Sequence, residues 1–376
     1  MPERAGGRVR AGPDHLRQRH GRRRRLLRPG QDAGRAGRAD LHRHGQADLL
    51  PVNARRGSRP RRSRPVGCLL FLVIAALLVA VIILLWFLLA GRLRLPGPGP
   101  EPTRPPASQP ASCPDVQLIS VPGTWESNSN DDPRNPTANP LSLMLNVTGP
   151  LREQFPAERL DVYTVPYVAQ FSNPVAIPPD GQQSYNNSRS EGTQRTIDAL
   201  AERHRECPLT TYVLAGFSQG AVIVGDVAAQ IGEGKGPVPA DLVLGVTLIA
   251  DGRREAGPGQ AIEVGATPPG VGAEVALNGL KVPGITMTGP RPGFGALADR
   301  TYTICAPGDM ICDSPRQALS PVNWIPSVLS LVRAAGNPVH ALYNTYVVDG
   351  NGTTATQWTV GWAAGLIESA PHPPHS

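Results

Sequence analysis

The chain has 376 residues, enough for one large domain or two ordinary ones, but its charge is unevenly distributed. Residues 1–65 contain nineteen Arg, no Lys and five acidic residues, a balance of +14 that leaves −7 for the remainder. The Arg runs lack helical periodicity, interleaved aromatic residues and zinc-ligand spacing, so we do not expect nucleic acid as a partner. We expect residues 1–65 to be a disordered Arg-rich tail, or to precede a true start near Val52.

An uninterrupted apolar segment follows this tail. Residues 68–90 are 23 consecutive apolar residues without charge or Pro, enough for a helix to cross a hydrocarbon core of ~30 Å. The apolar stretch of a cleaved signal peptide is shorter, at ~7–15 residues. More Arg residues precede the segment than follow it, which places the N-terminus in the cytoplasm and the rest of the chain outside. We predict a single-pass transmembrane anchor over residues 66–91.

The remaining chain divides by composition. Residues 92–112 are Pro-rich and predict an extended linker, residues 113–370 predict one folded domain, and residues 371–376 predict a disordered tail. Within the domain, runs of β-branched residues alternate with helical patterns, which predicts an α/β fold with a central, mostly parallel sheet covered by helices on both faces. Strands are predicted at 116–121, 160–165, 210–215, 242–250 and 301–305, and helices at 141–155, 191–207 and 221–231.

Two finer expectations concern the start of one helix and a stretch without clear periodicity. Ser188 precedes Glu191 by three residues, a spacing that predicts a capping box at the start of helix 191–207. Residues 252–300 are rich in Gly and Pro and predict a loop or lid over the site, or a few short strands.

The sharpest chemical signal is the motif Gly216-Phe217-Ser218-Gln219-Gly220. It stands between a predicted strand and a predicted helix, the context that the nucleophile elbow of serine hydrolases requires. Its glycines fit that turn, because Cβ atoms at the flanking positions would collide with the neighbouring strand and helix. The alternative is an ordinary Gly-rich turn whose Ser caps the helix. We predict that Ser218 is the nucleophile.

A serine hydroxyl needs a base to accept its proton, and the chain order in this class of enzyme is Ser, acid, His. His372 and His375 lie in the Pro-rich tail, which leaves His340 as the predicted base. The alternative for His340 is a surface histidine in the loop after Pro338.

The acid has three candidates. Asp251 ends a predicted strand, Asp313 directly follows Cys312, and Asp309 lies between Cys305 and Cys312. A disulfide closing that short loop would fix the carboxylate of Asp309 where it can orient an imidazole and stabilise its positive charge. We therefore predict Asp309 rather than Asp251.

Four cysteines lie beyond the apolar segment, in what we expect to be an oxidising compartment. They are Cys113, Cys207, Cys305 and Cys312, an even number that predicts disulfides. Three pairings are open, and the short spacing of Cys305 and Cys312 favours that pair together with Cys113–Cys207. A zinc site is the competing interpretation, but the chain has no C-x-x-C spacing at these positions.

Three motifs together resemble the cutinase family: GFSQG around Ser218, the C-x-x-G-D-x-x-C loop around Asp309, and His340 followed by Ala-Leu-Tyr. The resemblance covers residues 113–370 and implies an α/β-hydrolase fold in which Cys113 pairs with Cys207. With its predicted anchor and Pro-rich linker, the chain is most similar to the membrane-anchored cutinase-like lipases of mycolic-acid-containing actinobacteria. That group is associated with phospholipase and thioesterase activity and with the mycolate envelope.

The resemblance also implies an oxyanion hole formed by the backbone N–H of Gln219 and by Thr124. Residues 122–126 read PGTWE where the family has R-G-S-T-E, so Thr124 replaces a serine. Two positions depart from the family pattern. Phe217 stands where Tyr is usual, and residues 252–300 are longer than in compact fungal cutinases, so we do not expect an open, polymer-accepting site.

These observations predict an exported serine esterase or lipase, a phospholipase A or thioesterase among the specific forms, acting on acyl lipids of the cell envelope. The predicted chemistry requires no metal and no organic cofactor. One alternative is an acyltransferase that uses the same acyl-enzyme, and another is a non-catalytic envelope-binding protein on the same scaffold. Acyl chain length, head group and oligomeric state have no signature in the sequence.

Overall fold

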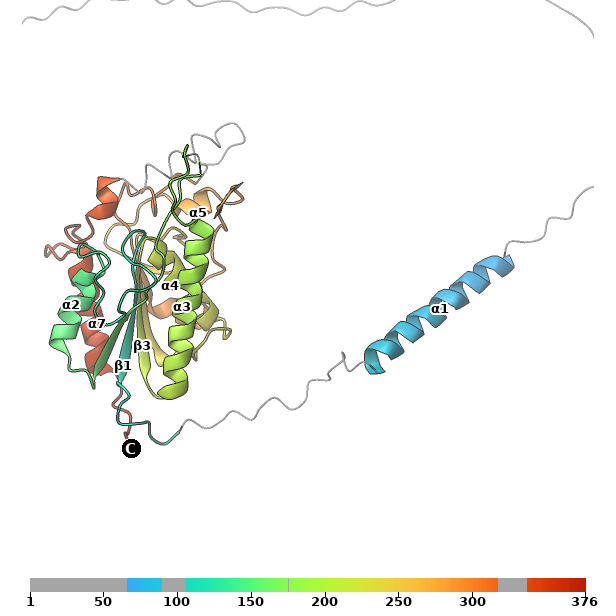
Figure 1. Cartoon of the computed structure of the whole chain (residues 1–376), viewed down its shortest axis with the longest axis horizontal. Helices are drawn as coiled ribbons and strands as arrows, with labels where there is room; N and C mark the ends of the chain where they lie inside the picture. Colours follow the sequence, from blue (N-terminus) through green and yellow to red (C-terminus); the bar gives the residue numbers. More distant parts are fainter. Residues whose placement is uncertain (1–65, 90–105, 175, 317–336) are drawn as a thin grey trace, which may run out of the picture. The chain divides into compact units, whose positions relative to one another are not determined.

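The computed structural model describes residues 66–89, 106–174, 176–316 and 337–376, and it divides into two units, Met1–Gly97 and Pro98–Ser376 (Figure 1). The predicted tail over residues 1–65 and most of the predicted linker over residues 92–112 lie outside the described residues.

Helix α1 is the described part of the first unit. It spans Val66–Leu89, contains no charged residue, and is rich in Leu, Ile and Val. Its side chains are described over residues 71–86, where all are exposed. No helix long and apolar enough to cross a bilayer was found within the described residues. The predicted transmembrane anchor therefore stays a prediction.

A six-stranded parallel sheet forms the centre of the second unit, in the order β2-β1-β3-β4-β8-β5. Every residue of β1 and β3 is buried, as expected for central strands of a parallel sheet covered on both faces. The predicted α/β class is confirmed. The strands are β1 Val116–Val121, β2 Leu160–Thr164, β3 Thr211–Phe217, β4 Val243–Ile249, β5 Ile262–Val264 and β8 Thr301–Ile304.

Helices cover both faces of this sheet (Figure 1). One hydrophobic core joins α2 and α7 to alternate residues of the strands, such as Leu118 and Val213. A second core joins α3 and α4 to residues of the opposite face, such as Ile119 and Leu214. The alternation follows from the two-residue period of side chains along a strand. The helices are α2 Leu145–Gln154, α3 Tyr185–Glu206, α4 Gln219–Gly232 and α7 Ala355–Ser369.

Residues 252–300 form several short elements around a small hydrophobic cluster of their own. The cluster contains Tyr185 at the start of α3 together with Ala273, Leu277, Ile285 and Met287. Strand β5 from this stretch also adds the outermost strand to the sheet, beside β8. The short elements of the second unit are η1 Ala240–Leu242, α5 Ala273–Ala276, β6 Lys281–Val282, β7 Ile285–Thr286, η2 Gly295–Arg300 and η3 Pro338–Ala341.

The predicted capping box of α3 is wrong. The helix begins at Tyr185, and the Oγ of its N-cap Ser184 accepts a hydrogen bond from the N–H of Asn187. Ser188 is instead buried within the first turn, and its hydroxyl donates to the carbonyl of Val168 at 2.6 Å. The first turn is polar, so its sequence carries no hydrophobic period that marks the start.

The C-terminal residues 371–376, predicted to be disordered, instead pair with the beginning of the domain. The N–H of Gln109 donates to the carbonyl of Pro374, and the N–H of Ser376 donates to the carbonyl of Gln109. The buried guanidinium of Arg159 donates to the carbonyls of Ala370 and Pro371. These bonds satisfy carbonyls at the end of α7 that have no partner within the helix, and they order the tail.

Candidate active site

Ser218 lies in the turn between β3 and α4, at the carboxyl edge of the sheet. Its φ of 55° places it in a strained conformation that costs a residue with a side chain about 1–3 kcal/mol. Two glycines make the turn feasible. A Cβ on Gly216 would lie 2.4 Å from the carbonyl oxygen of Gly220, and a Cβ on Gly220 would lie 2.1 Å from the carbonyl oxygen of Val121 on β1.

His340 meets Ser218 across 122 residues of sequence. It lies in η3, whose start is capped by the side chain of Asn337. Its Nε2 is 2.9 Å from the Oγ of Ser218, and its Nδ1 is 2.8 Å from the Oδ2 of Asp309. Because a carboxylate only accepts hydrogen bonds, this network assigns the ring proton to Nδ1 and leaves Nε2 to accept the hydroxyl proton.

The carboxylate of Asp309 is completely buried and is held from several sides. Its Oδ1 accepts a hydrogen bond from the N–H of Ile311 at 3.0 Å. Its Oδ2 accepts from His340 and, at 2.7 Å, from the hydroxyl of Tyr343. Burial, followed by the negative charge of Asp309, raises the pKa of Tyr343 well above its ordinary value of 10, so the phenol remains a donor. The structure thus brings together all three residues predicted for the triad.

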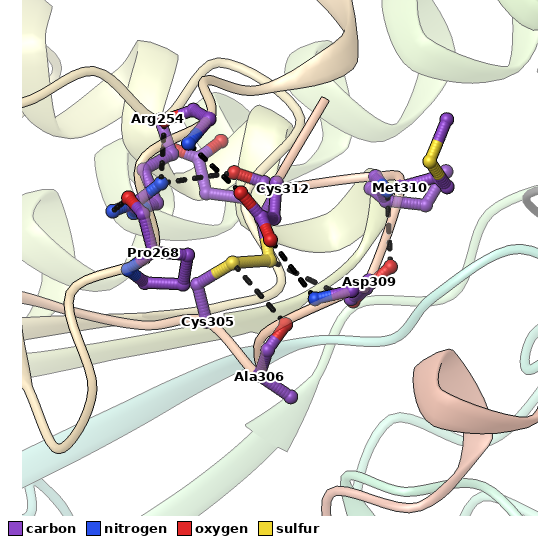
Figure 2. The surroundings of a disulfide bond; sticks show 12 residues. Arg254, Pro268, Cys305, Ala306, Asp309, Met310 and Cys312 are labelled. Carbon is purple, nitrogen blue, oxygen red and sulfur yellow. Dashed lines mark hydrogen bonds between the residues drawn. A yellow bond between two sulfur atoms is a disulfide. The ribbon is translucent and has the colours of Figure 1, made fainter. Parts of the chain in front are cut away.

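Both predicted disulfides are confirmed, Cys113–Cys207 and Cys305–Cys312. The second closes the short loop that carries Asp309 (Figure 2). The nearly buried guanidinium of Arg254 holds the end of this loop, because it donates to the carbonyl of Cys312 at 3.1 Å.

The two other candidate acids have different partners. Asp251 is buried and accepts two hydrogen bonds from the guanidinium of Arg291, at 2.5 and 3.0 Å. Asp313 accepts from the backbone N–H groups of Gly270 and Gly308. Neither has a hydrogen bond to His340 within the described residues.

The two residues predicted for the oxyanion hole line one cavity with Ser218. Gln219 is the first residue of α4, so its backbone N–H has no partner within the helix. Thr124 lies in the turn after β1, and its neighbour Trp125 has a positive φ of 65°. The side chain of Gln219 is within hydrogen-bond distance of the hydroxyls of Tyr167 and Ser188. These contacts join the start of α4 to the start of α3.

Glu126 ties the turn that contains Thr124 to Ser142 and Leu143, just before α2. Its Oε2 accepts from the N–H of Gly123 at 2.9 Å and from the hydroxyl of Ser142 at 3.1 Å. Its Oε1 accepts from the N–H of Leu143 at 2.7 Å. Burial raises the pKa of Glu126 above its ordinary value of 4.5, although these three hydrogen bonds and His340 oppose the rise.

The cavity has a volume of about 320 Å³ and opens beside Ser218 and His340. Its polar lining includes two carboxylates, Glu126 and Glu274, and no Lys or Arg among the described residues. No group of three or more His, Cys, Asp or Glu side chains suited to a metal ion occurs in the described part of the chain. Its apolar lining includes Leu141, Leu143, Phe171, Val222, Ala273 and Met287.

Sequence reasoning missed two aromatic residues that support the imidazole. The ring of Phe217 stacks on His340 with a centroid distance of 5.0 Å and an interplanar angle of 24°. Tyr343 donates to Asp309, as described above, and it follows His340 by three residues. That spacing, about one helical turn, was the available signal for Tyr343.

Comparisons with known proteins show which family the chain belongs to. Residues 112–330 match the Cutinase family. The carboxylesterase Culp6 homolog of Corynebacterium glutamicum is 51% identical over 278 residues, which cover 72% of this chain and 86% of that protein. Two solved structures, each 18% identical, are also similar. They are the catalytic core domain of acetyl xylan esterase from Trichoderma reesei (TM-score 0.41, covering 69% of this chain and 100% of that chain) and a cutinase-like protein from Cryptococcus sp. (TM-score 0.39, covering 72% and 100%). The chain belongs to the cutinase family of serine carboxylic ester hydrolases.

Proposed function

We propose that this protein is an exported, membrane-anchored esterase that hydrolyses acyl lipids of the cell envelope, as a phospholipase A or a thioesterase. One observation carries the catalytic part of the proposal. The Oγ of Ser218, the imidazole of His340 and the carboxylate of Asp309 form a continuous hydrogen-bonded chain at the mouth of a cavity with a largely apolar lining.

The proposed reaction begins at the hydroxyl of Ser218. The Oγ bonds to the acyl carbonyl carbon while Nε2 of His340 takes the hydroxyl proton. The proton then passes from Nε2 to the leaving oxygen or sulfur, whose bond to carbon breaks, and an acyl-enzyme remains. In the second half a water oxygen attacks the same carbon and gives one proton to Nε2. Release of the carboxylic acid returns that proton to Ser218.

The surroundings of the imidazole support this cycle. During each half-reaction His340 becomes positively charged, and the buried carboxylate of Asp309 stabilises that charge and keeps the ring oriented. The backbone N–H of Gln219, and Thr124 in the turn after β1, are the proposed donors to the oxyanion. In other acyl-transfer enzymes one such donor is worth about 3–4 kcal/mol of the activation barrier.

The apolar lining supports an acyl chain as the part of the substrate that enters the cavity. Apolar surface that leaves water on binding contributes about 25 cal/mol per Å². The absence of Lys and Arg among the described lining residues, together with the presence of Glu126 and Glu274, favours an uncharged acyl group over one that carries a carboxylate.

The nucleophile is tested by Ser218→Ala. We expect hydrolysis of a p-nitrophenyl acyl ester to fall by roughly 10⁴- to 10⁶-fold, the range seen when the catalytic serine of such enzymes is removed. Covalent labelling by a fluorophosphonate probe should disappear as well. Ser369→Ala, at the exposed end of α7, is the matched control and should retain both. A Ser218→Ala protein that still hydrolyses the ester contradicts the proposal.

The anchor is supported by the uncharged apolar run at residues 68–90. We expect the full chain to remain in the membrane fraction after washing with alkaline carbonate, and a chain beginning at residue 106 to be released. Release of the full chain by the same wash would contradict the anchor and leave the catalytic proposal untouched.

A further inference from the structure

The lining of the cavity has a buried part and an exposed part. Val222, Ala273 and Met287 are each less than 5% exposed, and we call this buried part of the lining the closed end. Trp125 is 49% exposed and Leu141 is 88% exposed, and we call this exposed part the open end. A substrate that spans the cavity therefore has one part enclosed by protein and another part in contact with solvent.

The wall of the closed end continues directly from the nucleophile. Val222 lies one turn along α4 from Ser218, and its N–H donates to the carbonyl of Ser218 at 3.1 Å. Gly252 lies beside Val222 and near Ile311, because a Cβ built on Gly252 would lie 3.1 Å from a methyl group of Val222 and 3.9 Å from one of Ile311. The N–H of Ala273 then donates to the carbonyl of Ile311 at 2.8 Å. Backbone hydrogen bonds and the close approach at Gly252 thus lead from Ser218 to α5.

Beyond α5 the wall is formed by the small hydrophobic cluster of residues 273–287. Met287 and Ala273 belong to this cluster and also line the cavity. Phe171 packs against the cluster, and its ring centroid lies 5.4 Å from that of Tyr185. Met287 is therefore a buried residue that belongs both to this cluster and to the lining of the cavity. Its unbranched thioether side chain is well suited to contact an alkyl chain.

Buried polar contacts fix this wall against α3. The carboxylate of Glu274 accepts hydrogen bonds from the hydroxyl of Tyr185, from Arg189 at 3.1 Å, and from the hydroxyl of Thr288 at 2.6 Å. Arg189 also pairs with Asp226 on α4. Because Thr288 directly follows Met287, these bonds hold the backbone of Met287 in place. The contacts of Glu274 thus fix the position of the closed end.

We propose that the closed end holds the acyl chain of the acyl-enzyme, that Met287 sets the length of chain it accepts, and that the alcohol or thiol part of the substrate lies at the open end. This inference rests on the proposed function, because it assumes that Ser218 carries the acyl group. The open end supports it independently, since Asn139 and Asn344 line the cavity and can donate hydrogen bonds to a polar leaving group.

The test measures kcat/KM on p-nitrophenyl esters from acetyl to palmitoyl for Met287→Trp, Met287→Ala and Leu280→Ala. The larger indole fills the closed end, so we expect Met287→Trp to lower the ratio of long-chain to acetyl activity by about tenfold or more. Met287→Ala should move the preferred ester to a longer chain. Leu280 belongs to the same hydrophobic cluster but does not line the cavity, so Leu280→Ala should leave the ratio unchanged.

The outcomes separate this inference from the proposed function. A chain-length profile that is unchanged in Met287→Ala, while a fluorophosphonate still labels Ser218, overturns the inference and leaves the proposed function standing. Failure of the probe to label Ser218 in the unaltered protein overturns both. If circular dichroism shows that Met287→Trp does not fold, the Ala variant decides the question.

Discussion

Two buried aspartates lie near the carboxyl edge of the sheet, each just beyond one of two adjacent strands, yet their surroundings give them different roles. Asp251 follows β4 and faces the guanidinium of Arg291. Asp309 follows β8 and faces the imidazole of His340 and the phenol of Tyr343. The first carboxylate is neutralised by a permanent charge. The second has only partners that are neutral in the network drawn above.

This difference separates a structural carboxylate from one suited to catalysis. An aspartate that is already paired with an arginine has its negative charge compensated by the guanidinium, so it is poorly placed to stabilise a second positive charge that develops on an imidazole. A carboxylate beside a neutral imidazole gains a partner at the moment the imidazole takes a proton. Burial strengthens that interaction because it excludes water. The nature of the partner, rather than the depth of burial, therefore identifies Asp309 as the proposed catalytic acid.

Among the variants that test this comparison, we expect the largest effect, a loss of activity, from Asp309→Asn. The amide keeps the size of the carboxylate but favours the wrong ring tautomer, so kcat for a p-nitrophenyl ester should fall by about 10⁴-fold with little change in thermal stability. Asp313→Asn is the matched control, four residues further along the chain and just beyond the disulfide loop, and should change kcat only slightly. Similar losses from both variants would show that the loop, and not the carboxylate of Asp309, was being measured.

Asp251→Asn should have the opposite effect, a large loss of stability with a small change in catalytic rate. Loss of one partner from a buried ion pair leaves the other charge uncompensated, so we expect the free energy of unfolding to fall by about 3–5 kcal/mol. Arg291 keeps an acidic partner, Asp226, at 2.8 Å, which favours the lower end of that range. The rate per folded molecule, standardised by fluorophosphonate titration, should change less than tenfold. A larger rate loss than that of Asp309→Asn would reverse the assignment of the acid.

Glu126 extends the comparison to a third carboxylate, which is partly buried and receives hydrogen bonds from neutral donors only. Its pKa is raised in the folded protein, so the unfolded chain ionises first and stability falls as pH rises from about 4.5 through the folded pKa. This is the smallest effect we expect. Urea unfolding at a series of pH values should show the fall in the unaltered protein and its absence in Glu126→Gln. Parallel pH profiles for the two proteins would contradict it.

The sequence was sufficient for the sites that depend on local patterns. The five residues around Ser218 combine a strand, a strained turn and a helix, and the turn demands glycine at two positions. The short spacing of Cys305 and Cys312 marked the loop of Asp309. Both signals lie within a few residues, where steric rules are strict and few alternative structures fit.

Contacts between distant segments had no comparable signal. Arg291 reaches Asp251 across 40 residues of mostly irregular structure, and Tyr185 reaches Glu274 across 89 residues. Nothing in the local sequence distinguishes these charged residues from exposed ones. The start of α3 was misplaced for a related reason, because Ser188 is buried by tertiary packing that a capping motif does not reveal.

The pairing of Gln109 with the C-terminal residues has a practical consequence. Both ends of the described catalytic unit meet near the start of β1, where the parallel strands begin, whereas Ser218 lies where they end (Figure 1). A tag, a surface tether or a fused domain attached at either end therefore emerges from the pole of the molecule away from the substrate opening. Such attachments should leave ester turnover unimpeded, which makes the unit well suited to immobilisation through its termini.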